Sequence, residues 1–134
     1  MSNFNIALLR TLHESLNNSL TKVSDQLTDL LDSKINVGSF TGAEDVNLVA
    51  NGLLMIKAWG EHNFALNLHS LLKAIKDDKI SDDNLYYQAI KVSRNATKSL
   101  SAHLTTLAKK DPKSANLVSL WPVWSEMNKF LGKK

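Results

Sequence analysis

The chain lacks cysteine, and its 134 residues include only two prolines and five glycines. Without cysteine, disulfide bonds and thiolate chemistry are both excluded. No apolar run approaches the roughly 20 residues that a membrane-spanning helix needs. The N-terminal sequence also lacks the leading positive charge and the cleavage site of a secretory signal. These absences favour a cytoplasmic protein without membrane insertion, and we take a bacterial origin as the default.

The charge is only weakly basic, with a formal net charge of +3. Most lysines are scattered, apart from one group at 109–113 and another at the C-terminus, as expected for solvated helix ends and a tail. Because no continuous basic face is visible, nucleic acid is not expected as a partner. A small basic nucleic-acid-binding bundle remains an alternative, and the salt dependence of any DNA binding would test it.

Apolar residues recur every three or four positions along most of the chain, which is the period of amphipathic helices. No stretch of useful length shows the alternation of a strand. We predict helices over about 4–32, 43–60, 62–78, 84–109 and 111–131, the last kinked or split at Pro122. The interpretation is a single all-α domain over 1–134, an antiparallel four-helix bundle with an additional C-terminal helical segment.

The predicted helix over 43–60 is apolar around most of its circumference, which is typical of a central helix. Thr41 and Glu44 have the spacing of a capping box at its start, and Gly60 is a natural stop. Gly52 in mid-helix costs roughly 1 kcal/mol relative to Ala. Gly52 therefore indicates either a close neighbouring backbone or an open surface. We expect one core that includes Leu16, Leu20, Leu53, Ile56, Leu68 and Leu104.

None of the four histidines has a second ligand type at a metal-binding spacing. His103 lies beside the apolar stripe of its helix, where we expect a packed, hydrogen-bonded ring. His13 lies on the predicted solvent flank of the first helix. Glycine-rich phosphate loops and nucleophile elbows are absent from the sequence as well. The sequence therefore predicts no catalytic residue, metal site or cofactor.

The two glycines of the 43–60 segment carry a resemblance to histidine phosphotransfer domains. In that family the acceptor histidine lies four residues before a helix glycine, and a second glycine precedes the next helix. Here Asn51–Gly52 is followed by Trp59–Gly60 and then by an apolar helix. The position of the acceptor is occupied by Leu48, which cannot be phosphorylated. The resemblance implies the bundle fold without the phosphotransfer chemistry.

More narrowly, the chain resembles the degenerate N-terminal phosphotransfer-like domains of type IV pilus chemosensory kinases and their stand-alone relatives in twitching motility. The corresponding segments are GLLMIKAWG (52–60), the helix at 84–109, DPKSAN (111–116) and LVSLWPVW (117–124). This resemblance implies a non-catalytic protein-interaction module in bacterial signalling or type IV pilus regulation. The implied partner is a signalling or pilus-regulation protein, and self-association stays open.

The resemblance also implies a docking surface, since in active domains a receiver domain docks over the histidine. The corresponding positions here are Leu48, Asn51, Gly52, Met55 and Trp59. We place Leu48, Met55 and Trp59 on one flank of the central helix, and Trp and Met are enriched at interfaces. The alternative is that the C-terminal segment covers this face with Trp121, Pro122 and Trp124 and makes it core.

His69, with His62 as the second choice, offers an alternative function, as the acceptor of an active phosphotransfer protein. A lysine one turn later, Lys73, would offset the charge of a phosphate. In the family motif the lysine is three positions after the histidine and precedes a glycine. Here Lys73 is four positions after His69 and precedes Ala74. Acid-labile phosphate that disappears in His69→Ala would identify this alternative.

Overall fold

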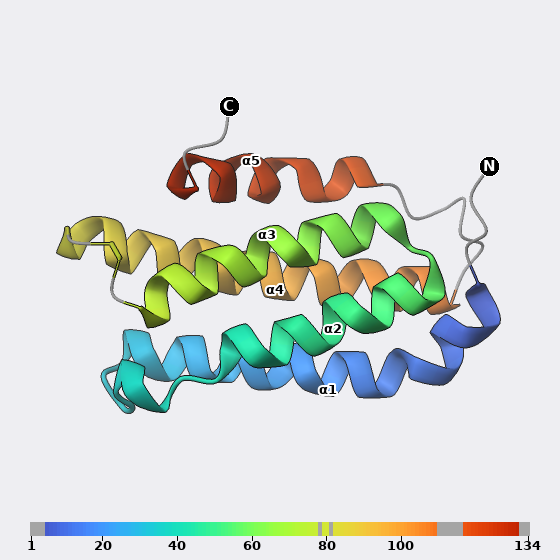
Figure 1. Cartoon of the computed structure of the whole chain (residues 1–134), viewed down its shortest axis with the longest axis horizontal. Coiled ribbons are helices and arrows are strands. Elements are labelled where there is room, and N and C mark those ends of the chain that lie inside the picture. The colour runs from blue at the N-terminus through green and yellow to red at the C-terminus, as the bar shows by residue number, and fades with distance from the viewer. Residues whose placement is uncertain (1–4, 78, 81, 110–116, 132–134) are drawn as a thin grey trace.

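The computed structural model describes residues 5–77, 79–80, 82–109 and 117–131. The described residues form five α-helices and two short 3-10 helices (Figure 1). In chain order these are α1 (Ile6–Leu31), η1 (Val37–Ser39), α2 (Gly42–Ile56), α3 (Trp59–Lys76), α4 (Asp83–Lys109), η3 (Leu117–Leu120) and α5 (Trp121–Phe130).

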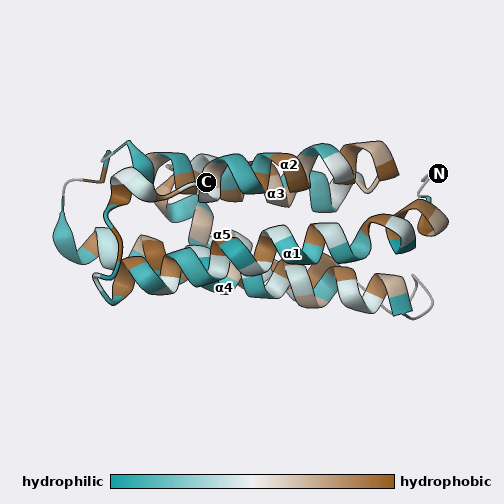
Figure 2. Ribbon diagram, turned by 90° about the horizontal axis from the view of Figure 1, so that it is seen from below, coloured by the Kyte–Doolittle hydropathy of each residue, from teal (hydrophilic) through white to brown (hydrophobic). Residues whose placement is uncertain are grey.

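The first four helices pack in a ring in which α1 contacts α2 and α4, and α3 contacts α2 and α4. Helix α5 packs on α3 and α4, and Figure 1 shows it on the side of the bundle opposite α1. The predicted four-helix bundle with a C-terminal helical segment is therefore confirmed. The helices alternate hydrophobic and hydrophilic residues along their length, as amphipathic helices do (Figure 2).

One apolar core is shared by all five α-helices. The six residues predicted for it are all buried, which confirms the helical period read from the sequence. The largest side chains that are fully buried include Phe40 and Phe64. Phe40 precedes α2, so the 33–40 connection also contributes to the core.

Helix α2 ends at Ile56, so the prediction of a helix that runs to Gly60 is wrong. Lys57 adopts a left-handed conformation with φ 66°, and the Ala58 N–H donates to the Leu53 carbonyl at 3.0 Å. The Lys57 N–H donates to the Leu54 carbonyl, which completes a Schellman motif. This ending is unusual because Lys, and not Gly, occupies the left-handed position.

Helix α3 therefore begins at Trp59, three residues earlier than predicted. Gly60 lies in its first turn, where a Cβ atom would overlap the side chain of Leu117. The absence of a side chain at Gly60 thus lets η3 approach the start of α3. The end of α3 at Lys76 is close to the predicted end at 78, a residue outside the described part of the chain.

Thr41 precedes α2 as predicted, but its side chain makes no capping hydrogen bond to the helix backbone. Its hydroxyl instead lies 3.0 Å from Oδ2 of Asp45 and 3.2 Å from Oε1 of Gln26. Its backbone N–H also donates to Oε1 of Gln26, at 3.0 Å. The predicted capping box is therefore wrong, because Gln26 of α1 takes the place of Glu44.

Pro122 lies in the first turn of α5, directly after η3, so the predicted segment is split at this proline. Its predicted beginning at 111–116 lies outside the described residues. The Trp124 ring of α5 meets the Phe64 ring of α3 edge to face, with centroids 5.2 Å apart. Together with buried Met127, this contact attaches α5 to the bundle.

Gly42, the first residue of α2, provides a test of this packing. A Cβ atom there would lie 2.6 Å from Cε1 of the buried Phe40 ring. We expect Gly42→Ala to lower the free energy of unfolding by about 1–3 kcal/mol through overpacking. This loss should exceed the gain in helix propensity, which is at most about 1 kcal/mol. Urea denaturation followed by circular dichroism measures the change.

Gly38 is the matched control, because an added Cβ there meets nothing within 4 Å. We expect Gly38→Ala to change the free energy of unfolding by less than about 0.5 kcal/mol. Equal effects of the two substitutions would contradict the placement of the Phe40 ring against Gly42.

Candidate functional site

Three large apolar side chains on α2 and at the start of α3 are exposed. Leu48 and Met55 on α2 are 62% and 65% exposed, and Trp59 at the start of α3 is 50% exposed. The placement of Trp59 on the same helix as the other two is wrong, because α2 ends before it. We call Leu48, Met55 and Trp59, with Asn51 and Gly52, the α2 face.

The alternative in which the C-terminal segment covers this face is wrong. Helix α5 packs on α3 and α4, and its Trp121 is itself exposed while Trp124 contacts Phe64. Asn51 is exposed and Gly52 is half-buried. A Cβ at Gly52 would lie 3.0 Å from Cδ2 of Leu16, so the close neighbour there is a side chain of α1.

The exposed positions of α2 between its two ends carry no charge. They are Asn47, Leu48, Asn51, Leu54 and Met55. Exposed Leu66 on α3 adds a further apolar side chain. Depletion of charge and enrichment of large apolar side chains characterise the centres of protein interfaces. Leu54 and Leu66 were not predicted from the sequence, since each stands apart from the stripe that Leu48 and Met55 define.

Two histidines of α3 bind the backbone of α2. Nδ1 of His62 lies 2.7 Å from the Ala50 carbonyl oxygen, and Nδ1 of His69 lies 2.8 Å from that of Ala43. A carbonyl oxygen only accepts, so each Nδ1 carries a proton and donates it. The two histidines and the two carbonyls are each seven residues apart, which ties the antiparallel helices together at two successive levels.

The alternative acceptor, His69, is therefore a half-buried ring held against α2, while Lys73 is exposed one turn later. Its Nδ1 is engaged in the bond to Ala43. The two residues lie on the same helix as predicted, and whether His69 accepts phosphate stays a prediction to be tested by labelling.

The remaining histidines also lie at helix contacts. His103 is buried, and its Nε2 lies 2.7 Å from Oε2 of Glu61, which confirms the expected hydrogen-bonded ring. His13 is half-buried and pairs with Oγ1 of Thr105 at 3.1 Å, so its placement on the solvent flank is wrong. The Thr105 hydroxyl donates to the Ser101 carbonyl, so His13 is the donor to Thr105.

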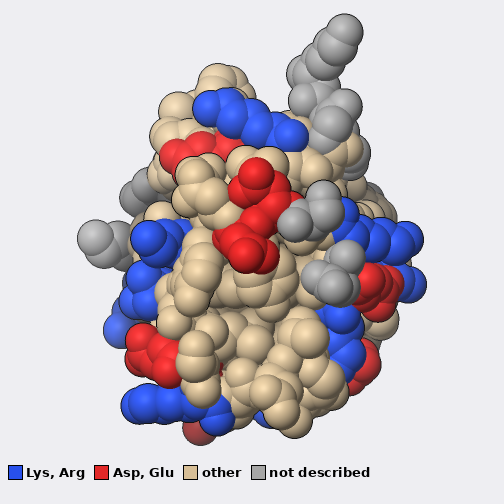
Figure 3. All heavy atoms as spheres, turned by 90° about the vertical axis from the view of Figure 1, so that its left-hand side faces the viewer, with Lys and Arg blue, Asp and Glu red and all other residues tan. Residues whose placement is uncertain are grey.

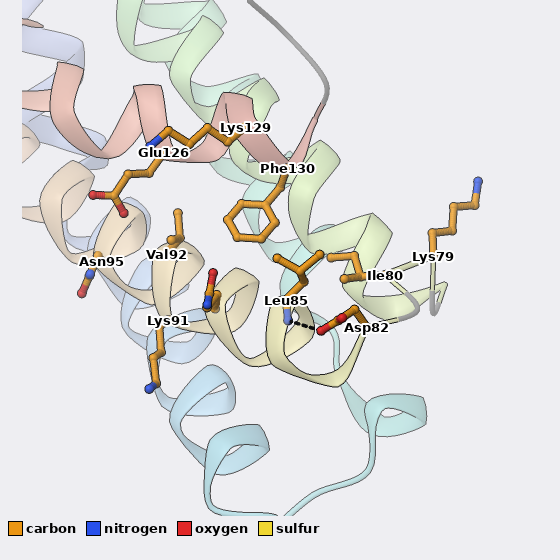
Figure 4. A pocket seen from close by; sticks show the side chains of 11 residues that line it. Lys79, Ile80, Asp82, Leu85, Lys91, Val92, Asn95, Glu126, Lys129 and Phe130 are labelled. Carbon is orange, nitrogen blue, oxygen red and sulfur yellow. Dashed lines mark hydrogen bonds between the residues drawn. The ribbon is translucent and has the colours of Figure 1, made fainter.

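A cavity of about 690 Å³ lies between α4, α5 and the turn before α4. Figure 4 shows Ile80, Leu85 and Phe130 pointing toward one another, whereas Lys79 points away. The Asp82 carboxylate accepts the Leu85 N–H at 3.0 Å and caps α4. The lining carries charges of both signs, from Lys79, Lys91 and Lys129 and from Asp82 and Glu126.

The described residues contain no group of three or more metal-ligating side chains. None of their helices combines the length and the hydropathy of a membrane-spanning segment. On the end of the bundle shown in Figure 3, lysine and arginine side chains are separated by acidic and uncharged ones. This end offers no continuous basic face of the kind that nucleic-acid binding requires.

The fold and the α2 face define the described part of the chain as an all-α bundle with one exposed helix face that is uncharged between its ends. Comparison with known protein families, with curated proteins and with solved structures gave no match.

Proposed function

We propose that the chain is a non-catalytic protein-interaction module that docks a partner through the α2 face. The observation that carries the proposal is the joint exposure of Leu48, Met55 and Trp59, at 62%, 65% and 50%. Large apolar groups gathered on a surface typically mark an interaction site, and Trp is enriched among interface hot spots.

The environment of the histidines supports a non-catalytic role. His13, His62, His69 and His103 each pair with a group on a neighbouring helix, which is a structural use of the ring. Leu48 occupies the position that corresponds to the acceptor in phosphotransfer domains. The pathway that we propose, bacterial signalling or type IV pilus regulation, rests on the resemblance to the degenerate domains of chemosensory kinases.

The proposal predicts that Trp59→Ala and Met55→Glu each weaken partner binding by at least about 1–2 kcal/mol, the scale of an interface hot spot. Truncation of Trp59 removes apolar contact area, and Glu at position 55 places a charge in the centre of the interface. The measurement is quantitative mass spectrometry of proteins retained from a lysate of the source organism, followed by titration of those that respond.

Trp121→Ala is the matched control, because Trp121 is 59% exposed but lies on α5. We expect this variant to retain the same proteins as the wild type. Melting temperatures should be similar for all variants, since each changed side chain is at least half exposed. Equal retention by wild type and Met55→Glu would contradict the proposed docking face.

A further inference from the structure

The two ends of the α2 face carry opposite charges. Exposed Glu44 lies in the first turn of α2, and exposed Lys57 follows its last residue. Lys57 is thirteen positions after Glu44, which corresponds to about 20 Å along a helix. Between them the exposed positions are uncharged, as described above. A surface with a neutral apolar centre and opposite charges at its two ends is complementary to its own copy in the reverse direction.

We propose that the occupant of the α2 face is a second copy of this chain, packed antiparallel about a two-fold axis. This inference rests on the proposed function, because it names the partner of the same face. In an isologous contact the same patch serves both subunits, so each charge of one copy meets the opposite charge of the other. A parallel pair would instead place Glu44 against Glu44 and Lys57 against Lys57, which is repulsive.

The apolar side chains set the register of the pair. The most apolar arrangement places Leu48 of one copy against Met55 of the other, twice, because the axis relates the two contacts. The axis then passes between the levels of Asn51 and Gly52. The two Asn51 amides lie beside the axis, where each can both donate and accept a hydrogen bond. A polar residue at the centre of a helix pair favours one register over shifted ones.

The charges agree with this register. Glu44 lies one turn before Leu48 and therefore opposite the chain just beyond Met55 of the second copy. Because α2 ends at Ile56, that part of the second copy is the turn that begins with Lys57. A lysine side chain is long enough to reach the Glu44 carboxylate from this turn. One ion pair thus closes each end of the apolar contact, and Trp59 lies at the same margin.

Sedimentation velocity of the whole chain tests the inference over concentrations from about 1 µM to about 1 mM, the range of weak association. We expect the wild type to change from monomer to dimer within this range. Met55→Glu should raise the dissociation constant at least about tenfold, because it brings a carboxylate against Leu48 twice. Tyr87→Glu, at an exposed apolar position on α4, should leave association unchanged.

Charge variants test the antiparallel direction, because in a parallel pair each single charge reversal would only replace one like-charge contact with another. Glu44→Lys and Lys57→Glu alone should each weaken association about 3- to 10-fold, since each creates two like-charge contacts at the rim. An equimolar mixture of the two should recover wild-type affinity, because only the mixed pair restores both opposite-charge contacts. High salt should reduce these differences. Circular dichroism checks that each variant is folded.

Each outcome decides between named alternatives. Weakening by each single charge variant together with recovery on mixing supports the antiparallel pair. Single charge variants without effect, a mixture without recovery, or a dimer that Met55→Glu does not weaken overturns it. A wild type that stays monomeric also overturns it. If the wild type is monomeric but retains a lysate protein that Met55→Glu does not retain, the proposed docking function stands with a different occupant. If no retained protein responds either, both proposals fail.

Discussion

Phe64→Ala will lower the free energy of unfolding by about 3–5 kcal/mol, the range for removal of a buried aromatic side chain. Phe64 has no exposed surface, and its ring meets that of Trp124 at a centroid distance of 5.2 Å. The substitution therefore leaves a cavity in the core and removes the partner of Trp124. Aromatic pairs of this geometry add roughly 0.5–1.5 kcal/mol beyond buried area. Urea denaturation monitored by tryptophan fluorescence measures the loss.

The control for this prediction is Trp121→Ala, which removes a larger ring that is mostly exposed on α5. We expect it to change stability by less than about 0.5 kcal/mol, as at most surface positions. A loss below about 1 kcal/mol in Phe64→Ala would contradict the attachment of α5 through this ring pair.

Leu53→Ala should cost about 2–5 kcal/mol, as is typical of a buried leucine. Leu53 is fully buried, whereas the adjacent Leu54 is 42% exposed. The two side chains have the same chemistry and lie on the same helix, so their difference isolates burial from helix propensity. Denaturant midpoints of Leu53→Ala and Leu54→Ala, measured side by side, give the comparison.

We expect Leu54→Ala to cost clearly less than half as much, because only the contacts of its covered part are lost. Its effect on association is the more informative measurement, since it borders the α2 face. If Leu53→Ala and Leu54→Ala were equally destabilising, the assignment of the core and outer sides of α2 would be wrong.

The fold followed from the sequence because the spacing of apolar residues in an amphipathic helix predicts which side is buried. Leu16, Leu20 and Leu104 all proved buried at positions that this spacing predicts. The end of α2 at Ile56 could not be predicted in this way. A left-handed Lys57 has no signal in composition, since glycine is the residue that usually marks this position.

The candidate surface was predictable only in part. The sequence by itself determined that α2 carries more apolar residues than one core face needs. The additional apolar residues are therefore either covered by another segment or exposed. The sequence did not determine which, because the side chains of an exposed stripe and of a second core stripe have the same spacing. The position of α5 in the fold determines that the stripe is exposed. The Trp124 ring contacts Phe64 of α3, so α5 lies away from Leu48 and Met55. Such a choice depends on contacts between residues far apart in the chain, which no local period encodes.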